Sequence, residues 1–116
     1  MGRAPLRLTP PLYHVLLTLA EGPSHGYALI GSVAERTDGR VELGPSSLYY
    51  ALGRLEDAGL IRECAPAPSG DQPHEEQRRY YELTDSGRLR LREEMEILSG
   101  IMSHARAVGL ASGGRP

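Results

Sequence analysis

The stretch GPSSLYYALGRLEDAGLI, residues 44–61, limits the fold more than any other part of the chain, because it reads as a helix with two unlike faces. At about 100° per residue, one arc of this helix is apolar. Its members are Leu48, Ala51, Leu52, Leu55 and Ala58. The opposite arc holds Ser46, Tyr49, Tyr50, Gly53 and Asp57, with Ser47 and Arg54 at its edge. The apolar arc predicts packing on a core, and the hydroxyl-rich arc is left to contact another molecule.

Two helices and a short strand are expected before this stretch. Thr9 as N-cap and Pro10 in the first turn predict the start of the first helix. A second helix is expected from Ser24 to Arg36. Residues 40–43, RVEL, alternate polar and apolar side chains, which predicts a half-buried strand. The apolar stripes of the two helices are Leu12, Val15, Leu16 and Leu19, then Leu29, Ile30 and Val33.

A β-hairpin is expected after the two-faced helix. Its strands are residues 60–64 and 78–83, and they flank the loop APAPSGDQPHEEQ, residues 65–77. Three prolines and a glycine in thirteen positions favour a protruding loop. Alternation places Tyr81 on the core side of the second strand and Tyr80 on the other side, where it either packs or contacts a ligand.

The last predicted helix begins after Thr84 and carries a heptad-like apolar seam. A helix of some twenty residues exceeds about 30 Å, which is longer than the small core can cover, so its apolar rows are expected to meet a second copy of the chain. The predicted dimerisation residues are Leu91, Met95, Leu98, Ile101, Met102 and Ala105. Met95 and Met102 could instead line a ligand pocket, because thioethers adapt to varied shapes.

The order helix, helix, strand, helix, strand, loop, strand, long helix is that of a winged helix-turn-helix with a C-terminal arm. We therefore expect a mainly α fold with a small β-hairpin, divided into a DNA-binding domain at 1–86, a dimerisation helix at 87–110 and a disordered tail at 111–116. In such a fold the third helix offers its outer face to the DNA major groove. The residues predicted to contact DNA on this basis are Ser46, Ser47, Tyr49, Tyr50 and Arg54, with Arg78 and Arg79 on the wing.

Three segments, HGYALIGSV, LGPSSLYYALGRLEDAGLI and RRYYELTDSGRLRL, resemble the PadR family of transcriptional regulators over residues 11–98 or so. The resemblance implies a cytoplasmic bacterial or archaeal homodimer, usually a repressor, that binds a near-palindromic DNA operator and is often released by a small-molecule effector. His25, Gly26 and Tyr27 match the family motif at the second helix, which adds His25 and Tyr27 to the expected DNA contacts. The family's recognition-helix start is matched by Pro45, Leu48 and Tyr49, and its wing strand and cap by Arg79, Tyr80, Tyr81, Leu83, Thr84 and Gly87.

Two departures from the family pattern concern the DNA-facing surface. Tyr50 stands where the family commonly has a proline, so the operator sequence does not transfer. Residues 74–77, His-Glu-Glu-Gln, replace a frequent Gly-Arg-Pro, and the two carboxylates would repel phosphates at the tip of the wing.

Composition limits the other functions. The net charge of −2 and pI near 6.1 mean that any attraction to nucleic acid must be local. Cys64 has no partner at metal-ligand spacing and His74-Glu75-Glu76 lacks a second histidine, so neither an enzyme nor a cofactor is expected. Without a signal-type or membrane-length apolar stretch, we expect a cytoplasmic protein. The alternative function is a winged-helix protein-interaction or ligand-sensing module that does not bind DNA.

Overall fold

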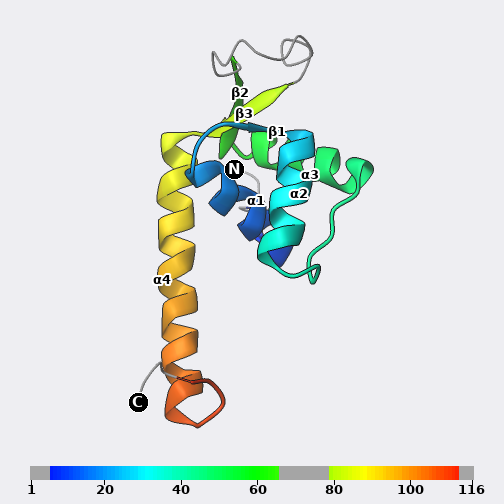
Figure 1. The fold of residues 1–116 in the computed structure, drawn as a ribbon. Coiled ribbons are helices and arrows are strands. Elements are labelled where there is room, and N and C mark those ends of the chain that lie inside the picture. The colour runs from blue at the N-terminus through cyan, green and yellow to red at the C-terminus, as the bar shows by residue number, and fades with distance from the viewer. Residues whose placement is uncertain (1–5, 66–78, 113–116) are drawn as a thin grey trace.

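The computed structural model describes residues 6–65 and 79–112. The elements are α1 (Pro10–Ala20), β1 (Ser24–His25), α2 (Gly26–Arg36), α3 (Pro45–Asp57), β2 (Ile61–Cys64), β3 (Tyr80–Leu83) and α4 (Asp85–Ala107). The three shorter helices and the sheet form one compact unit, and the far half of α4 extends well beyond it (Figure 1). This mainly helical arrangement with a small antiparallel sheet confirms the predicted winged helix. None of the helices in the described ranges is long and apolar enough to cross a membrane.

The helix boundaries follow the capping residues. Thr9 precedes α1 with Pro10 as its first residue, and Gly44 precedes α3, as the sequence predicts. Gly59 has φ of +78°, a left-handed conformation that suits glycine and turns the chain from α3 into β2. The second helix begins two residues later than expected, because His25 and not Ser24 is its N-cap.

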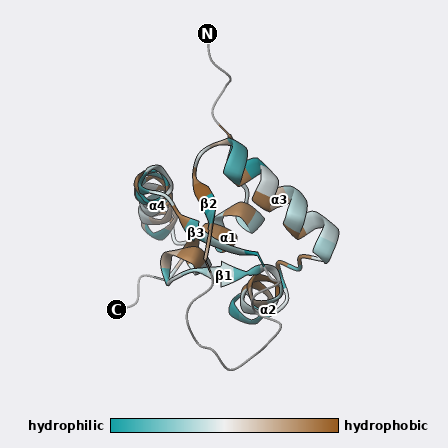
Figure 2. Ribbon diagram, turned by 90° about the horizontal axis from the view of Figure 1, so that it is seen from above, coloured by the Kyte–Doolittle hydropathy of each residue, from teal (hydrophilic) through white to brown (hydrophobic). Residues whose placement is uncertain are grey.

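The sheet has the order β1-β3-β2, and all of its pairs are antiparallel (Figure 2). Ser24 pairs with Tyr81 and His25 with Tyr80, so the third strand is β1. The predicted strand at residues 40–43 is wrong. The Thr37 hydroxyl oxygen accepts the Val41 N–H at 3.0 Å, and this side-chain bond folds the segment back toward the end of α2.

The core confirms the apolar arc of α3 over most of its length. Leu48, Leu52 and Leu55 are 1% exposed or less, and Ala51 is buried as well. Ala58 is the exception, since it is exposed at the C-cap of the helix. The leucine face packs against α1 and α2, which surround the sheet together with α4 (Figure 2). The buried partners on α1 and α2 are Leu12, Val15, Leu16, Leu19, Leu29 and Val33.

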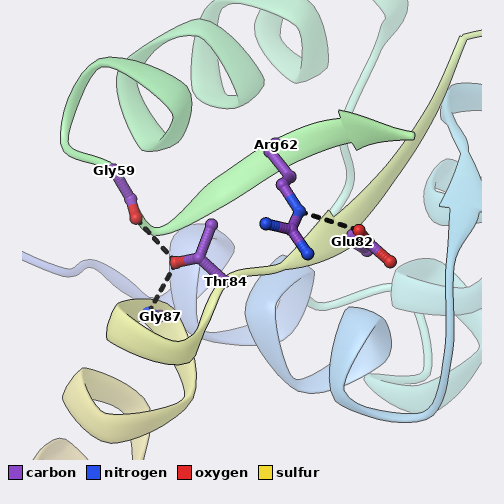
Figure 3. A network of polar contacts seen from close by, with 5 residues as sticks. All are labelled: Gly59, Arg62, Glu82, Thr84 and Gly87. Carbon is purple, nitrogen blue, oxygen red and sulfur yellow. Dashed lines mark hydrogen bonds and ion pairs between the residues drawn. The ribbon is translucent and has the colours of Figure 1, made fainter.

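The start of α4 is fixed to the turn between α3 and β2 (Figure 3). The Thr84 hydroxyl donates to the Gly59 carbonyl oxygen at 2.6 Å and accepts the Gly87 N–H at 2.9 Å. The Thr84 N–H donates to the Leu60 carbonyl oxygen at 3.1 Å. A Cβ at Gly87 would lie only 1.9 Å from that same Leu60 oxygen, so the helix approaches the turn as closely as a glycine allows.

A second connection joins α4 to α1 and to the segment before it. The Tyr13 hydroxyl donates to Glu94 Oε1 at 2.9 Å, and Arg90 Nε donates to Glu94 Oε2 at 2.8 Å. Arg90 Nη2 also donates to the Leu6 carbonyl oxygen at 2.6 Å. The hydrogen bonds from Arg90 and Tyr13 hold the pKa of Glu94 below its usual value, and the bond to Glu94 raises the pKa of Tyr13.

This connection predicts a pH-dependent loss in Glu94→Gln. A carboxyl whose pKa is lowered by folding stabilises the folded state above its unfolded pKa, and that stabilisation disappears as the pH falls through the folded pKa. Glu94→Gln should therefore lower the free energy of unfolding by about 1 kcal/mol at pH near 7. The difference from the native protein should disappear at pH values below the folded pKa of Glu94, as measured by urea unfolding at each pH.

Glu93→Gln is the matched control, because Glu93 is an exposed neighbour on α4 and loses the same charge. It should change the unfolding midpoint little at either pH. Equal losses in the two variants would mean that the network around Glu94 does not stabilise the fold.

Candidate nucleic-acid interface

The outer face of α3 is the most polar surface that the fold leaves uncovered on a core helix. Ser46 and Ser47 are exposed in its first turn, and Tyr49 and Tyr50 follow with 50% and 67% of their surfaces exposed. Arg54 is exposed one turn later. The fold therefore presents on one face the hydroxyls and the arginine that the sequence assigned to DNA contact.

Tyr50 and Arg54 form a pair on this face. Arg54 Nη1 donates to the Tyr50 hydroxyl oxygen at 3.1 Å, and the guanidinium carbon lies 5.7 Å from the centre of the Tyr50 ring. Their spacing of four residues places both side chains on the same side of the helix. The arginine is thus held in a fixed direction and keeps other N–H donors for an acceptor such as a phosphate oxygen.

Tyr49 lies against the first turn of α2. A Cβ at Gly26 would lie 2.8 Å from the Tyr49 hydroxyl oxygen and 3.2 Å from Leu48 Cδ2. Gly26 therefore lets α3 approach the N-terminus of α2, where the exposed Tyr27 follows it. Tyr49 packs between the two helices and still exposes half of its surface, so it combines a structural and a surface position.

Two of the predicted contact residues are engaged in capping. The Ser47 hydroxyl oxygen accepts the Gly44 N–H at 3.0 Å and lies 3.2 Å from the Gly44 carbonyl oxygen. His25 Nδ1 accepts the Ala28 N–H at 3.3 Å, and the ring edge of His25 meets Tyr80 with 5.1 Å between ring centres. His25 is therefore a helix-start hydrogen-bonding residue, as its position in the sequence indicated.

The contact with His25 also explains why Tyr80 is buried, with only 7% of its surface exposed. Both faces of β3 are covered, so Tyr80 and Tyr81 are packed on opposite sides of the strand. Burial raises the pKa of Tyr81, and a hydrogen bond with Arg79 lowers it in part. Burial likewise raises the pKa of the Cys64 thiol in β2, which leaves that cysteine protonated at neutral pH.

The wing is only partly within the described residues. Arg79 is exposed, with its Nε 3.9 Å from Glu63 Oε2, and Arg62 pairs with Glu82 at 2.8 Å across β2 and β3 (Figure 3). Arg78 and the acidic residues 71–76 lie outside the described residues. The exposed ion pair between Arg62 and Glu82 holds the hairpin in register and leaves Arg79 as the exposed cation at its start.

The residues predicted for dimerisation divide into an inner and an outer group. Leu91 is 5% exposed within its own protomer and Met95 packs partly against the same core, so these two help to seat α4. Leu98, Ile101 and Met102 are 37%, 60% and 44% exposed, and Ala105 is half-buried. The uncovered apolar face of α4 consists of Ile97, Leu98, Ile101, Met102 and Val108.

One residue near this interface escaped the sequence analysis. Arg7 precedes the N-cap of α1 and lines a cavity together with Tyr50 and Arg54. Its position follows from the packing of segments far apart in the chain, and no local motif marks it. Within the parts of the chain that the structure describes, no cluster of His, Cys, Asp and Glu could hold a metal ion.

Residues 15–93, more than half of the chain, match the sequence profile of the Transcriptional regulator PadR-like family. The chain belongs to this family. Solved PadR structures share its fold: a PadR family transcription regulator from Clostridium difficile R20291 is 24% identical, with a TM-score of 0.70 over 86% of this chain and 98% of that one. A second, from Eggerthella lenta DSM 2243, is 27% identical with a TM-score of 0.60, over 81% and 79% of the two chains.

A relative of the PadR-like chain occurs in a mobile element. It is an uncharacterised 37.1 kDa protein in transposon TN4556 of Streptomyces fradiae, and it is 44% identical over 91 residues. The match covers 74% of this chain and 23% of that protein, so the chain spans about a quarter of the length of its relative. Membership in the family makes this a chain of the transcriptional-regulator type.

Proposed function

We propose that the protein is a sequence-specific DNA-binding transcriptional regulator that acts as a homodimer, in the manner of a repressor released by a small-molecule effector. The observation that carries the proposal is the two-faced α3, in which fully buried leucines oppose a row of exposed hydroxyls and the Tyr50–Arg54 pair. A helix of this kind fits the DNA major groove, where side chains reach base edges and phosphates.

The homodimer is supported by the outer part of α4. Its uncovered apolar side chains lie beyond the region where α4 packs on its own core, and contiguous apolar surface of this kind favours a partner. In the proposed dimer, residues 87–110 form the arm and the rest of the described chain forms the DNA-binding unit. Two recognition helices then enter successive major grooves about 34 Å apart.

The experiment that tests the proposal is binding to the DNA upstream of the protein's own gene, followed by fluorescence anisotropy. Tyr50→Ala and Arg54→Ala should each weaken binding by about tenfold, because each removes one base or phosphate contact. Both side chains are exposed, so the variants should keep the unfolding midpoint and the dimer mass. Since Arg54 donates to the Tyr50 hydroxyl, the double variant should lose less than the product of the single losses.

Arg88→Ala is the matched control, because Arg88 is an exposed arginine on α4 away from the proposed interface. It should leave DNA affinity unchanged at fixed salt. The log-log salt dependence of binding should be steep, about −0.9 for each phosphate neutralised. A slope near zero, with no loss in Tyr50→Ala or Arg54→Ala, would contradict DNA binding through α3.

The alternative is a protein-interaction or ligand-sensing module without DNA binding, and the net charge of −2 is the observation that favours it. A protein of that kind would form the same dimer and show no salt-dependent binding to any duplex. The salt titration therefore separates the two functions.

A further inference from the structure

A cavity of about 400 Å³ lies between the segment before α1 and the outer side of α3. Leu6 and Leu12 line it from the N-terminal side, Ala51 lines it from α3, and Leu43 adds a further apolar side chain. Binding sites for small molecules typically enclose about 300–1,000 Å³, are mostly apolar and carry a few polar groups that orient the ligand. The volume is at the lower end of that range, which fits a compact molecule.

The charged residues that line this cavity are both arginines, Arg7 and Arg54. No carboxylate lines it, and neither arginine lies within ion-pair distance of a carboxylate in residues 6–65 and 79–112. The chain as a whole carries a net charge of −2, so the cavity is a local positive site on an acidic protein. Charge complementarity therefore selects an anion.

The apolar part of the cavity excludes a bare phosphate as its best occupant. A phosphate ion or a DNA backbone has no apolar surface to place against Leu6, Leu12 and Leu43. Burying those side chains against a ligand requires a hydrocarbon or aromatic body. The occupant that matches both parts of the cavity is apolar at one end and acidic at the other.

We propose that this cavity binds a compact organic acid, with its apolar body against the leucines and its acidic group between Arg7 and Arg54. The hydroxyl of Tyr50, which is already fixed by Arg54 at 3.1 Å, supplies a further polar group at the same rim. The N-terminal wall is held in place from the other side, since Arg90 of α4 bonds to the Leu6 carbonyl oxygen.

Occupancy of the cavity has a consequence for the proposed function. Ser47, Tyr50 and Arg54 line the cavity and are also residues proposed to contact DNA, so the acid and the DNA compete for the same side chains. This second step rests on the proposed function, whereas binding of the acid does not. The two steps are therefore tested separately.

The binding step is tested without DNA, with anilinonaphthalene sulfonate as the probe. This dye carries an aromatic body and one acidic group, and its fluorescence rises in an apolar site. We expect saturable binding of one dye per protomer. Arg7→Ala should weaken it by about tenfold, the loss expected when one charge-assisted contact is removed.

Two controls separate this cavity from other apolar surfaces, above all the uncovered face of α4. Arg88→Ala removes the same charge elsewhere and should leave the dye affinity unchanged. Phenylnaphthylamine, the neutral analogue, should bind the native protein and Arg7→Ala equally. Equal affinity of the sulfonate dye for the native protein and Arg7→Ala, with the fold intact by circular dichroism, would overturn the proposed site.

The competition step uses the dye and the upstream DNA together. The dye should raise the apparent dissociation constant for DNA in proportion to its occupancy, and the neutral analogue should do so less. If the native protein binds the dye in an Arg7-dependent way but binds no DNA, the site stands and the proposed function fails. If the protein binds DNA and saturating dye leaves that affinity unchanged, the competition is overturned while DNA binding stands.

Discussion

Gly87→Ala is expected to lower the free energy of unfolding by about 3 kcal/mol, at the upper end of the usual cost of overpacking. The added Cβ would lie 1.9 Å from the Leu60 carbonyl oxygen and 2.9 Å from its carbonyl carbon. These are backbone atoms in a turn whose carbonyl also accepts the Thr84 N–H, so they cannot rotate aside as a side chain could. Urea unfolding followed by circular dichroism measures the loss.

Gly31→Ala is the matched control for this variant. Gly31 is exposed in α2, and a Cβ there meets no atom within 4 Å. Alanine is a better helix former than glycine by up to about 1 kcal/mol, so this variant should be neutral or more stable than the native protein. A Gly87→Ala protein as stable as Gly31→Ala would show that α4 does not seat against the Leu60 turn.

The second large effect is expected for Leu52→Ala on the inner face of α3. Leu52 is 1% exposed and belongs to the main core, so its truncation should cost about 3 kcal/mol through lost burial and the cavity left behind. Tyr50→Ala, two residues away on the outer face, should change the free energy of unfolding by less than about 0.5 kcal/mol. The pair measures the separation of the two faces directly.

Both outcomes for this pair are informative about function. DNA affinity measured on the folded fraction should fall for Tyr50→Ala and stay near the native value for Leu52→Ala. Loss of stability in Tyr50→Ala equal to that in Leu52→Ala would mean that Tyr50 is part of the core, which would remove the basis for the proposed interface.

The inner face of α3 was predictable from sequence because helical periodicity alone decides which side chains share an arc. Helix starts at Thr9, Gly44 and Thr84 were predictable for a similar reason, since capping depends on residues next to one another in the chain. These features are local, and local physics is written in short stretches of sequence.

Features that depend on contacts between distant segments were not predictable in this way. The two-residue strand β1 exists because Ser24 and His25 meet β3, and no alternation of two residues could mark it. Tyr80 is buried for the same reason, since His25 covers the face that alternation left open. The heptad spacing placed Leu91 in a row with Leu98, but only the tertiary packing shows that Leu91 lies against its own core.

The candidate site divides along the same line. Exposed Tyr50 and Arg54 follow from their place on the polar arc of α3. The role of Arg7 depends on a cavity between residues some forty positions apart, and the bond from Arg90 to Leu6 joins residues 84 positions apart. Sequence periodicity carries no information about such a meeting.

The tight seat of Gly87 on Leu60 acts as a fulcrum for the long arm beyond it. The 23 residues of α4 span about 34 Å, so a tilt of roughly 10° at this pivot carries the far end through about 6 Å. Stacked base pairs rise by about 3.4 Å each, so in a dimer joined at the arm's far end such a tilt would shift the reading heads by nearly two steps along the duplex. Leverage of this size makes the register between half-sites sensitive to sub-ångström changes at one glycine.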